Sequence, residues 1–395
     1  MSLTMTRQEA TRARWALAAM FAGGGMLVGA WAPQIPLLLP KHGIDKAVLG
    51  LLILGLGVGA MLAMLVAGKA IQKYGTLPLL RLAALAQAPV LPLVVYAPSL
   101  PLLALAMVLF GLMMGFLDVL ANSNAVEIER RLGRAVMSSL HGFWSLGGFI
   151  AGTVGAWIIS KTSAETQSLV AAGAIAALVL IAMPYLRGAP PEGVPQPGTA
   201  AAVKDSFLPK DPGIWILGVM ALMAFVPEGS ILDWGALYLG EAFGADEFTA
   251  GLGFAFFAAS MAITRFLGDR LRNIFGGVRI FFFSALIAGI GMALAAAAPG
   301  SWIAIFGFAI SGLGCANLVP VIFSAAGNYP GQRAGAALSV VTMVGYAGIL
   351  MAPASIGWLA EHFGHRVTFG GLAVMIFGLA ALAGRTASAD DRQVV

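Results

Sequence analysis

The stretch RGAPPEGVPQPGTAAAVKDSFLPKDP, residues 187–212, lies almost midway along a chain of 395 residues. It holds six prolines and three glycines, and its few hydrophobic residues follow no helical or strand period. Such a segment buries too little apolar surface to offset the entropy lost on ordering. The stretch therefore predicts a linker at 187–211, which divides the chain into domains at 1–186 and 212–395.

The residues on either side of this linker look like two copies of one unit. Short motifs recur in the same order at offsets of 195 to 201 residues. The matched pairs are Phe110-Gly111 with Phe306-Gly307, Ala121-Asn122 with Ala316-Asn317, and Gly68…Gly75 with Gly268…Gly276. Their common order and spacing predict a two-fold internal repeat.

The composition indicates a membrane protein. Hydrophobic residues make up 59% of the chain and charged residues only 10%, against roughly 25% charged residues in soluble domains. Apolar runs of about 20 residues, the length that crosses a bilayer as a helix, follow one another along the chain. We therefore expect an all-α membrane protein with 12 transmembrane helices in two pseudo-symmetric six-helix bundles. The predicted spans are 15–39, 47–71, 77–97, 101–127, 135–159, 166–186, 212–239, 247–271, 278–298, 301–326, 334–360 and 366–384.

The positive charges predict the orientation of these helices. If the N-terminus is cytoplasmic, nineteen of the 23 Lys and Arg residues fall in cytoplasmic segments. The outer segments then hold only Lys41, Lys46, Lys161 and Arg366. This bias predicts that both termini are cytoplasmic. It also accounts for the net charge of +5, so we expect no nucleic-acid partner.

Six plus six helices and a polar central linker resemble the major facilitator superfamily. Its motif, a glycine, Asp-Arg and a further glycine, lies between the second and third helices of each half. The C-terminal half has Gly268-Asp269-Arg270 and Gly276, whereas the N-terminal half keeps Gly68 and Gly75 but has Gln72 in place of the aspartate. The resemblance implies that this loop latches the two halves on the cytoplasmic face. Gating roles are therefore expected for Gly68, Gly75, Gly268, Asp269 and Arg270.

Three segments within this frame look most similar to the fucose-permease-like branch of sugar:proton symporters. They are GFLDVLANSNAVE at 115–127, LHGFWSLGG at 140–148 and PEGSILDWGALYL at 227–239. The resemblance implies an acid in the fourth helix, which this chain has, and another in the first helix, where it offers only Gln34.

Asp118 is the ionisable residue nearest the middle of the fourth predicted span. An acid within hydrocarbon is costly and usually lines a pathway. Gly111, Gly115, Asp118 and Asn122 are spaced by four, three and four residues, so they share one helix face. The alternative is a packing stripe with a hydrogen-bonded acid. We expect Asp118 to carry a proton and Asn122 to contact it or the solute.

The seventh predicted span carries two more acids, Glu228 and Asp233. The Pro227-Glu228-Gly229 sequence predicts a break in this helix, with carbonyls free for a solute. Counting residues places Glu228 near mid-depth, as a second proton-coupling candidate or a structurally paired acid. It places Asp233 nearer the outer face, at an outer gate or in a hydrogen bond between helices. The same count places Arg265 near the cytoplasmic end, as a latch rather than a partner for the acids.

Four further residues are candidates for solute contact, besides Asn122. Trp31 and Trp234 offer indole faces on which a sugar or flat heterocycle can stack, although tryptophan is also a common interface anchor. Gln34 lies between two prolines of the first span, and Asn317 is the repeat counterpart of Asn122.

Several classes of function are excluded or disfavoured. The chain has no G-x-x-x-x-G-K-[ST] loop for ATP, no catalytic constellation and no spacing typical of a metal site. We therefore expect no enzyme activity, cofactor or metal. A channel would need pore-lining rings or filters, whereas an internal repeat with sparse central acids is typical of alternating access.

The sequence thus predicts a secondary active transporter, monomeric and multi-pass, in a bacterial cytoplasmic (inner) membrane. Its partners are protons, the lipid bilayer and a small solute. Proton symport of a sugar-like or other neutral polar solute is the leading reading, since no arginine or lysine is predicted at mid-depth to hold an anion. The alternatives are proton-driven efflux of drugs or metabolites, uptake of an aromatic heterocycle, a channel, or a non-transporting receptor.

Overall fold

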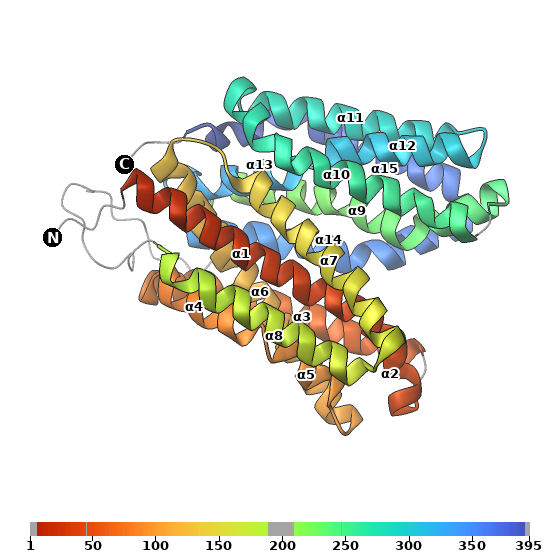
Figure 1. The fold of residues 1–395 in the computed structure, drawn as a ribbon. Helices are drawn as coiled ribbons and strands as arrows, with labels where there is room; N and C mark the ends of the chain where they lie inside the picture. Colours follow the sequence, from red (N-terminus) through yellow and green to blue (C-terminus); the bar gives the residue numbers. More distant parts are fainter. Residues whose placement is uncertain (1–5, 45, 189–208, 246, 392–395) are drawn as a thin grey trace.

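A computed structural model describes residues 6–44, 46–188, 209–245 and 247–391, and every regular element within these ranges is helical (Figure 1). Most of the predicted linker therefore lies outside the described residues. We call residues 6–188 the N-half and residues 209–391 the C-half. The N-half contains α1 (Arg7–Trp31), η1 (Ala32–Gln34), α2 (Ile35–His42), α3 (Lys46–Tyr74), α4 (Thr76–Ala86), α5 (Val90–Val95), α6 (Leu100–Leu132), α7 (Met137–Lys161), α8 (Ala164–Ala182) and η2 (Met183–Tyr185). The C-half contains α9 (Pro212–Phe243), α10 (Glu247–Phe275), α11 (Gly277–Ala297), α12 (Ser301–Cys315), α13 (Leu318–Gly327), α14 (Ala334–Phe363), α15 (His365–Ala381) and η3 (Ala383–Ala389).

Ten helical segments of the described chain are long and apolar enough to cross a membrane, and α15 with η3 forms an eleventh candidate bent by 54°. The span predicted at 77–97 is present as two helices, α4 and α5, and therefore falls short of a single continuous span. Pro89 and Pro92 explain the interruption, because proline supplies no N–H for the helical ladder.

Close glycine contacts hold neighbouring helices together within the N-half. A Cβ atom at Gly111 of α6 would lie 1.8 Å from the Leu56 carbonyl oxygen of α3. A Cβ atom at Gly25 of α1 would lie 1.9 Å from the Trp144 carbonyl oxygen of α7. Only glycine allows such backbone approach, which is how membrane helices pack most tightly.

Two helices depart from the predicted breaks. The break expected at Pro227 is wrong, since α9 runs without interruption from Pro212 to Phe243. Proline removes a single N–H there, the donor to the Met223 carbonyl four residues earlier, and the helix continues on the bonds of the flanking residues. The break lies instead in the span predicted at 301–326, between α12 and α13 at Ala316–Asn317. Pro320 accounts for it, because a proline cannot donate to the carbonyl four residues before it.

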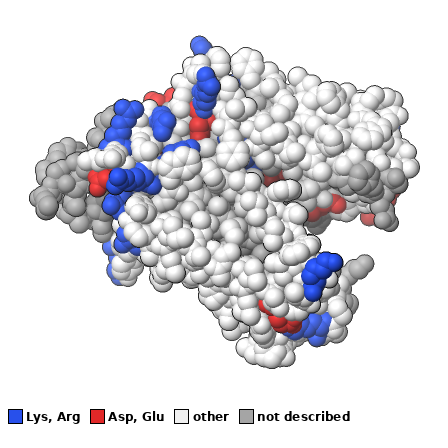
Figure 2. Space-filling view, viewed as in Figure 1, with Lys and Arg blue, Asp and Glu red and all other residues white. Residues whose placement is uncertain are grey.

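The two halves meet at one end of the molecule and separate at the other. Both termini lie at the same end in Figure 1, which we call the terminal end. The halves contact each other through α3 on α14 and α7 on α10. Figure 2 shows the opposite end hollowed between the halves, and we call it the open end. Most basic atoms in this view gather at the terminal end, whereas acidic atoms are visible along one wall of the hollow.

Candidate functional site

Asp118 lies inside the N-half, about 21 Å along α6 from the terminal end of that helix. It is only 7% exposed. The Asn122 amide donates to its Oδ1 (3.1 Å), and the Asn122 Oδ1 lies 3.1 Å from Nε2 of His141 on α7. Asp118 Oδ2 is buried and has no hydrogen-bond partner among the described residues. One carboxylate oxygen can thus take up a proton without giving up a hydrogen bond to a described residue.

A second polar group joins the halves beside this one. Arg265 of α10 donates to the Ser145 hydroxyl of α7 (2.5 Å), and its Nη2 lies 3.5 Å from Oε2 of Glu228 on α9. The side chain of Arg265 is 8% exposed and that of Glu228 is 36% exposed. Arg265 therefore holds an acid of its own half and a hydroxyl of the other half at once.

This pairing corrects the depth argument made from sequence. Counting residues placed Arg265 away from the acids and left mid-depth without a cation, yet its guanidinium reaches Glu228. Side chains on a helix lean toward its N-terminus, and the N-terminus of α10 faces the open end. The long arginine side chain therefore lies nearer the middle of the molecule than its Cα atom does.

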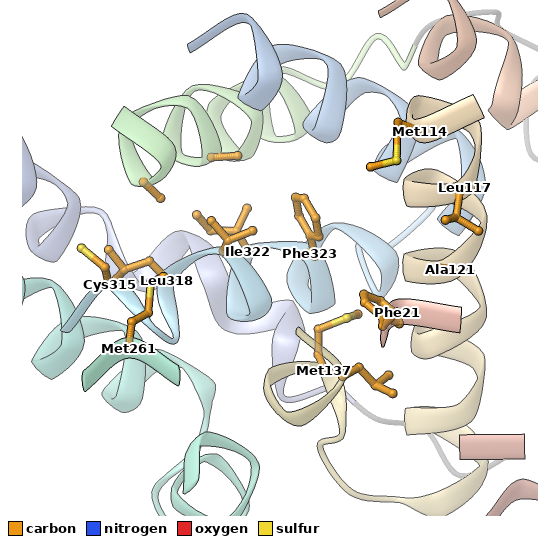
Figure 3. Packing of buried hydrophobic residues seen from close by; sticks show 14 of the residues in the cluster. Phe21, Met114, Leu117, Ala121, Met137, Met261, Cys315, Leu318, Ile322 and Phe323 are labelled. Atoms are coloured by element: carbon orange, nitrogen blue, oxygen red, sulfur yellow. The ribbon is translucent and has the colours of Figure 1, made fainter. Parts of the chain in front are cut away.

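A row of rings from five helices lies across the centre. Phe21 of α1 is 5.2 Å from the ring of His141, which is 5.9 Å from Phe323 of α13. Phe323 is 6.4 Å from Phe225 of α9, which is 5.8 Å from Tyr346 of α14. Figure 3 shows Phe21 and Phe323 among the buried side chains between the halves. We call these five residues the aromatic row.

Asp269 fastens the C-half to the start of α7. Its two carboxylate oxygens accept from the backbone N–H groups of Ser138 (2.9 Å) and Ser139 (3.0 Å). A carboxylate at a helix N-terminus is stabilised by the free N–H groups and by the helix dipole. Gly268 brings the two surfaces together, because a Cβ atom there would lie 2.9 Å from both Cβ and Oγ of Ser138 on α7. Asn317 accepts from the Ser138 hydroxyl (3.0 Å).

A buried ion pair, absent from the predicted sites, lies nearer the terminal end. Arg272 Nη1 of α10 is 3.0 Å from Glu129 Oε1 of α6, and the two side chains are 1% and 0% exposed. The Ser324 hydroxyl of α13 donates to Glu129 Oε2 (2.5 Å). Glu129 and Ser324 are 195 residues apart, which is an offset of the internal repeat. Repeat-related positions meet where two similar halves face each other. The repeat offset could therefore have suggested the contact of Glu129 with Ser324, but not the ion pair with Arg272, which is 143 residues away.

The remaining predicted gating residues differ in their surroundings. Gly68 faces α14, where an added Cβ atom would lie 3.0 Å from the Ser339 hydroxyl. Gly75 separates α3 from α4 with a φ of 76°, which favours glycine. Asp233 and Arg270 are exposed and lie outside the contacts just described.

Three residues predicted to contact the solute pack against other residues of their own half: Gln34 and Trp31 in the N-half and Trp234 in the C-half. Gln34 is buried, and its amide donates to the Ala164 carbonyl (2.9 Å) and to the side chain of Gln167. Trp31 packs edge-on against Phe110 at 5.8 Å. Trp234 lies against the C-half helices α14 and α15, with its indole nitrogen buried and without a partner among the described residues. The structure brings none of these three to the aromatic row.

Comparisons with known proteins agree with this architecture. The sequence profile of the Major Facilitator Superfamily matches residues 15–238 and 229–393. An "Uncharacterized MFS-type transporter" of Yersinia pestis is 36% identical over 381 residues, covering 96% of this chain and 95% of the relative. "Membrane protein MosC" of Rhizobium meliloti is 30% identical, covering 88% and 84%. The crystal structure of the transporter FucP in the outward conformation matches with a TM-score of 0.74 at 16% identity, covering 94% and 98%, which shows the shared fold.

Proposed function

This chain belongs to the major facilitator superfamily of secondary transporters, and from that premise we propose that it moves a small neutral solute together with a proton. One observation carries the proposal. Asp118 lies buried, with one carboxylate oxygen that bonds to none of the described residues, between an end where the halves are joined and an end where they separate. A site between two alternately closing ends is what alternating access requires.

We further propose that the terminal end is cytoplasmic, in a bacterial inner membrane. The excess of lysine and arginine in the segments near that end supports this orientation. The bacterial origin of the relatives supports the location. The structure then represents the outward-facing state, with the contacts of Asp269 and Glu129 closing the cytoplasmic side.

The surroundings of the two acids support separate roles for them. Asp118 is neutral when protonated and has one hydrogen-bond donor beside it, Asn122. Its charge can therefore change within the transport cycle, as a proton carrier requires. Glu228 is paired with Arg265 and partly exposed. We assign Asp118 to proton coupling and Glu228 with Arg265 to holding the solute and the gate.

Phe225 and Tyr346, the half-buried phenyl and phenol rings of the aromatic row, support a solute with one flat apolar face and several hydroxyl or N–H groups. Rings stack on such faces, and Asp118, Asn122 and Glu228 supply acceptors around them. A sugar fits this description, in keeping with the fucose-permease-like segments, and an aromatic heterocycle is a related possibility. A second candidate is an organic anion, because a solute carboxylate can replace Glu228 beside Arg265.

The transport class is tested by solute counterflow in liposomes. Sugars, nucleosides, vitamins and carboxylic acids are first screened by thermal shift, and the solutes that stabilise the purified protein are then used. We expect exchange that saturates with concentration, because each half-cycle carries a bound solute. Leakage that rises linearly with concentration would indicate a channel, and binding without exchange would indicate a receptor. Stabilisation by carboxylates alone would favour the anion.

The two-domain organisation is also a proposal, and a deletion tests it. The segment 190–205 has no apolar face to bury, so removing part of it should leave folding and assembly intact. The measurement is the size-exclusion profile and melting temperature of the shortened protein. An aggregated product would show that the segment contributes to the fold.

A further inference from the structure

A groove on the side of the C-half lies apart from the central site. It runs between α14 and α15, with Leu222 and Val226 contributed by α9, and its volume is about 510 Å³. Known small-molecule sites have volumes of about 300–1,000 Å³. The groove is therefore large enough to bind a ligand.

The lining of the groove is hydrocarbon. Its polar side-chain groups are the hydroxyls of Ser355 and Thr368, and Thr368 donates to the Gly364 carbonyl of its own turn (3.0 Å). Met351 and Val367 are each 63% exposed. A polar solute finds no partner here. Candidate membrane spans cover α9 and the part of α14 from Ala334 to Ala352. The groove continues from that part of α14 toward the open end, so we expect its exposed side chains to face the bilayer.

The length of the groove matches one leaflet. Along α14 its lining runs from Gly348 to Phe363, which corresponds to about 22 Å at the helical rise. One leaflet contributes about 15 Å of hydrocarbon and about 5–7 Å of headgroup region. The groove therefore suits a single lipid of one leaflet, with the chain parallel to α14.

The end of the groove nearest the open end carries the features of a membrane interface. Trp358 is 53% exposed and stacks on His362 with ring centroids 4.4 Å apart. Tryptophan concentrates at the level of lipid headgroups. Arg366 is exposed, precedes the lining residue Val367, and has its guanidinium 5.1 Å above the Phe243 ring. Arginine is well suited to hold a phosphate.

We propose that this groove binds one membrane phospholipid, with an acyl chain between α14 and α15 and the phosphate at Arg366. The inference is independent of the transported solute, since the groove and the central site share no residue named above.

Two adjacent glycines of α15 provide the test. A Cβ atom at Gly371 meets no atom within 4 Å and Gly371 lines the groove, so the side chain of Gly371→Leu starts in open space and extends along the groove. Gly370 is equally unobstructed but does not line the groove, so Gly370→Leu is the matched control. Both changes raise helix propensity by a similar amount.

The experiment is native mass spectrometry of the full chain, extracted in mild detergent with phosphatidylglycerol and phosphatidylethanolamine added. We expect wild type and Gly370→Leu to retain one phospholipid per monomer, and both Gly371→Leu and Arg366→Gln to lose it several-fold. Equal retention by wild type and Gly371→Leu would overturn the proposal. A wild-type dimer that is absent from Gly371→Leu would also overturn the proposal, since a second copy of the chain would then occupy the groove. Chain-brominated phospholipid provides a second readout, since it should quench fluorescence less in Gly371→Leu than in Gly370→Leu; equal quenching in the two variants counts against the proposal.

Discussion

Replacing Glu129 by glutamine is expected to open the terminal end of the protein. The Glu129 carboxylate accepts from the backbone N–H groups of Val136 and Met137, at 2.9 and 3.1 Å, as well as from Arg272 and Ser324. Removing its charge leaves the guanidinium of Arg272, 1% exposed, without its counter-ion. Breaking a buried pair in this way costs about 3–5 kcal/mol. Opening the halves hydrates Arg272 and relieves this cost. The equilibrium constant that favours the closed terminal end over the open one should therefore fall by a factor of about a hundred or more.

Labelling of a buried thiol at the gate measures this change. Met137 is 0% exposed at the start of α7, and Met137→Cys in a Cys315→Ser background reports access from the terminal end. The Glu129→Gln variant should react with maleimide about a hundredfold faster. Glu127→Gln is the control, because Glu127 pairs with Arg131 within α6 at 2.8 Å and makes no bridge between the halves in that pair. Equal rates in the two variants would show that the Glu129 pair does not hold the gate.

Replacing Asp118 by asparagine should abolish accumulation while leaving exchange intact. Asparagine resembles the protonated acid in shape and neutrality, so the variant can complete the steps that the loaded carrier makes. It cannot release a proton, and a pH gradient then does no work on the solute. One pH unit is worth about 1.4 kcal/mol, so wild type should accumulate solute up to about tenfold, whereas the variant should stop at a ratio of about one.

The variant Glu228→Gln should behave differently from Asp118→Asn in the same assays. Glu228→Gln removes the partner of Arg265 and should weaken solute binding, which raises the half-saturating concentration for exchange. Glu127→Gln should behave as wild type in the same liposomes. Should Asp118→Asn still accumulate solute under a pH gradient, Asp118 is not the coupling residue and Glu228 takes that role.

The sequence was informative about helices and about which acids lie inside. Hydropathy predicts the spans because each apolar run must satisfy its own backbone hydrogen bonds as a helix within the bilayer, whichever helices pack beside it. Asp118 could be singled out for the same reason, since an acid in hydrocarbon needs a partner, and the structure gives it Asn122. The predicted latch at Gly268-Asp269 could be read from the loop motif. The structure places both residues against the start of α7.

Contacts between the two halves could not be predicted from local sequence patterns. Arg265 was misplaced because a residue count gives the depth of a Cα atom and not that of a guanidinium. Asn317 looked like a solute contact by its repeat position, yet it accepts from Ser138 of the other half. The pair of Glu129 and Arg272 depends on how the halves are docked in this state, which neither segment encodes alone.

The most direct test of alternating access is a pair of distances measured by spin labels on one protein. Labels at Lys73 and Arg270 span the halves at the terminal end, and labels at Lys161 and Ala242 span them at the open end; all four residues are exposed. In Cys315→Ser liposome samples, Glu129→Gln should lengthen the terminal-end distance and shorten the open-end distance relative to wild type. A longer terminal-end distance with no change, or an increase, at the open end would contradict the account, because both ends would then be open at once.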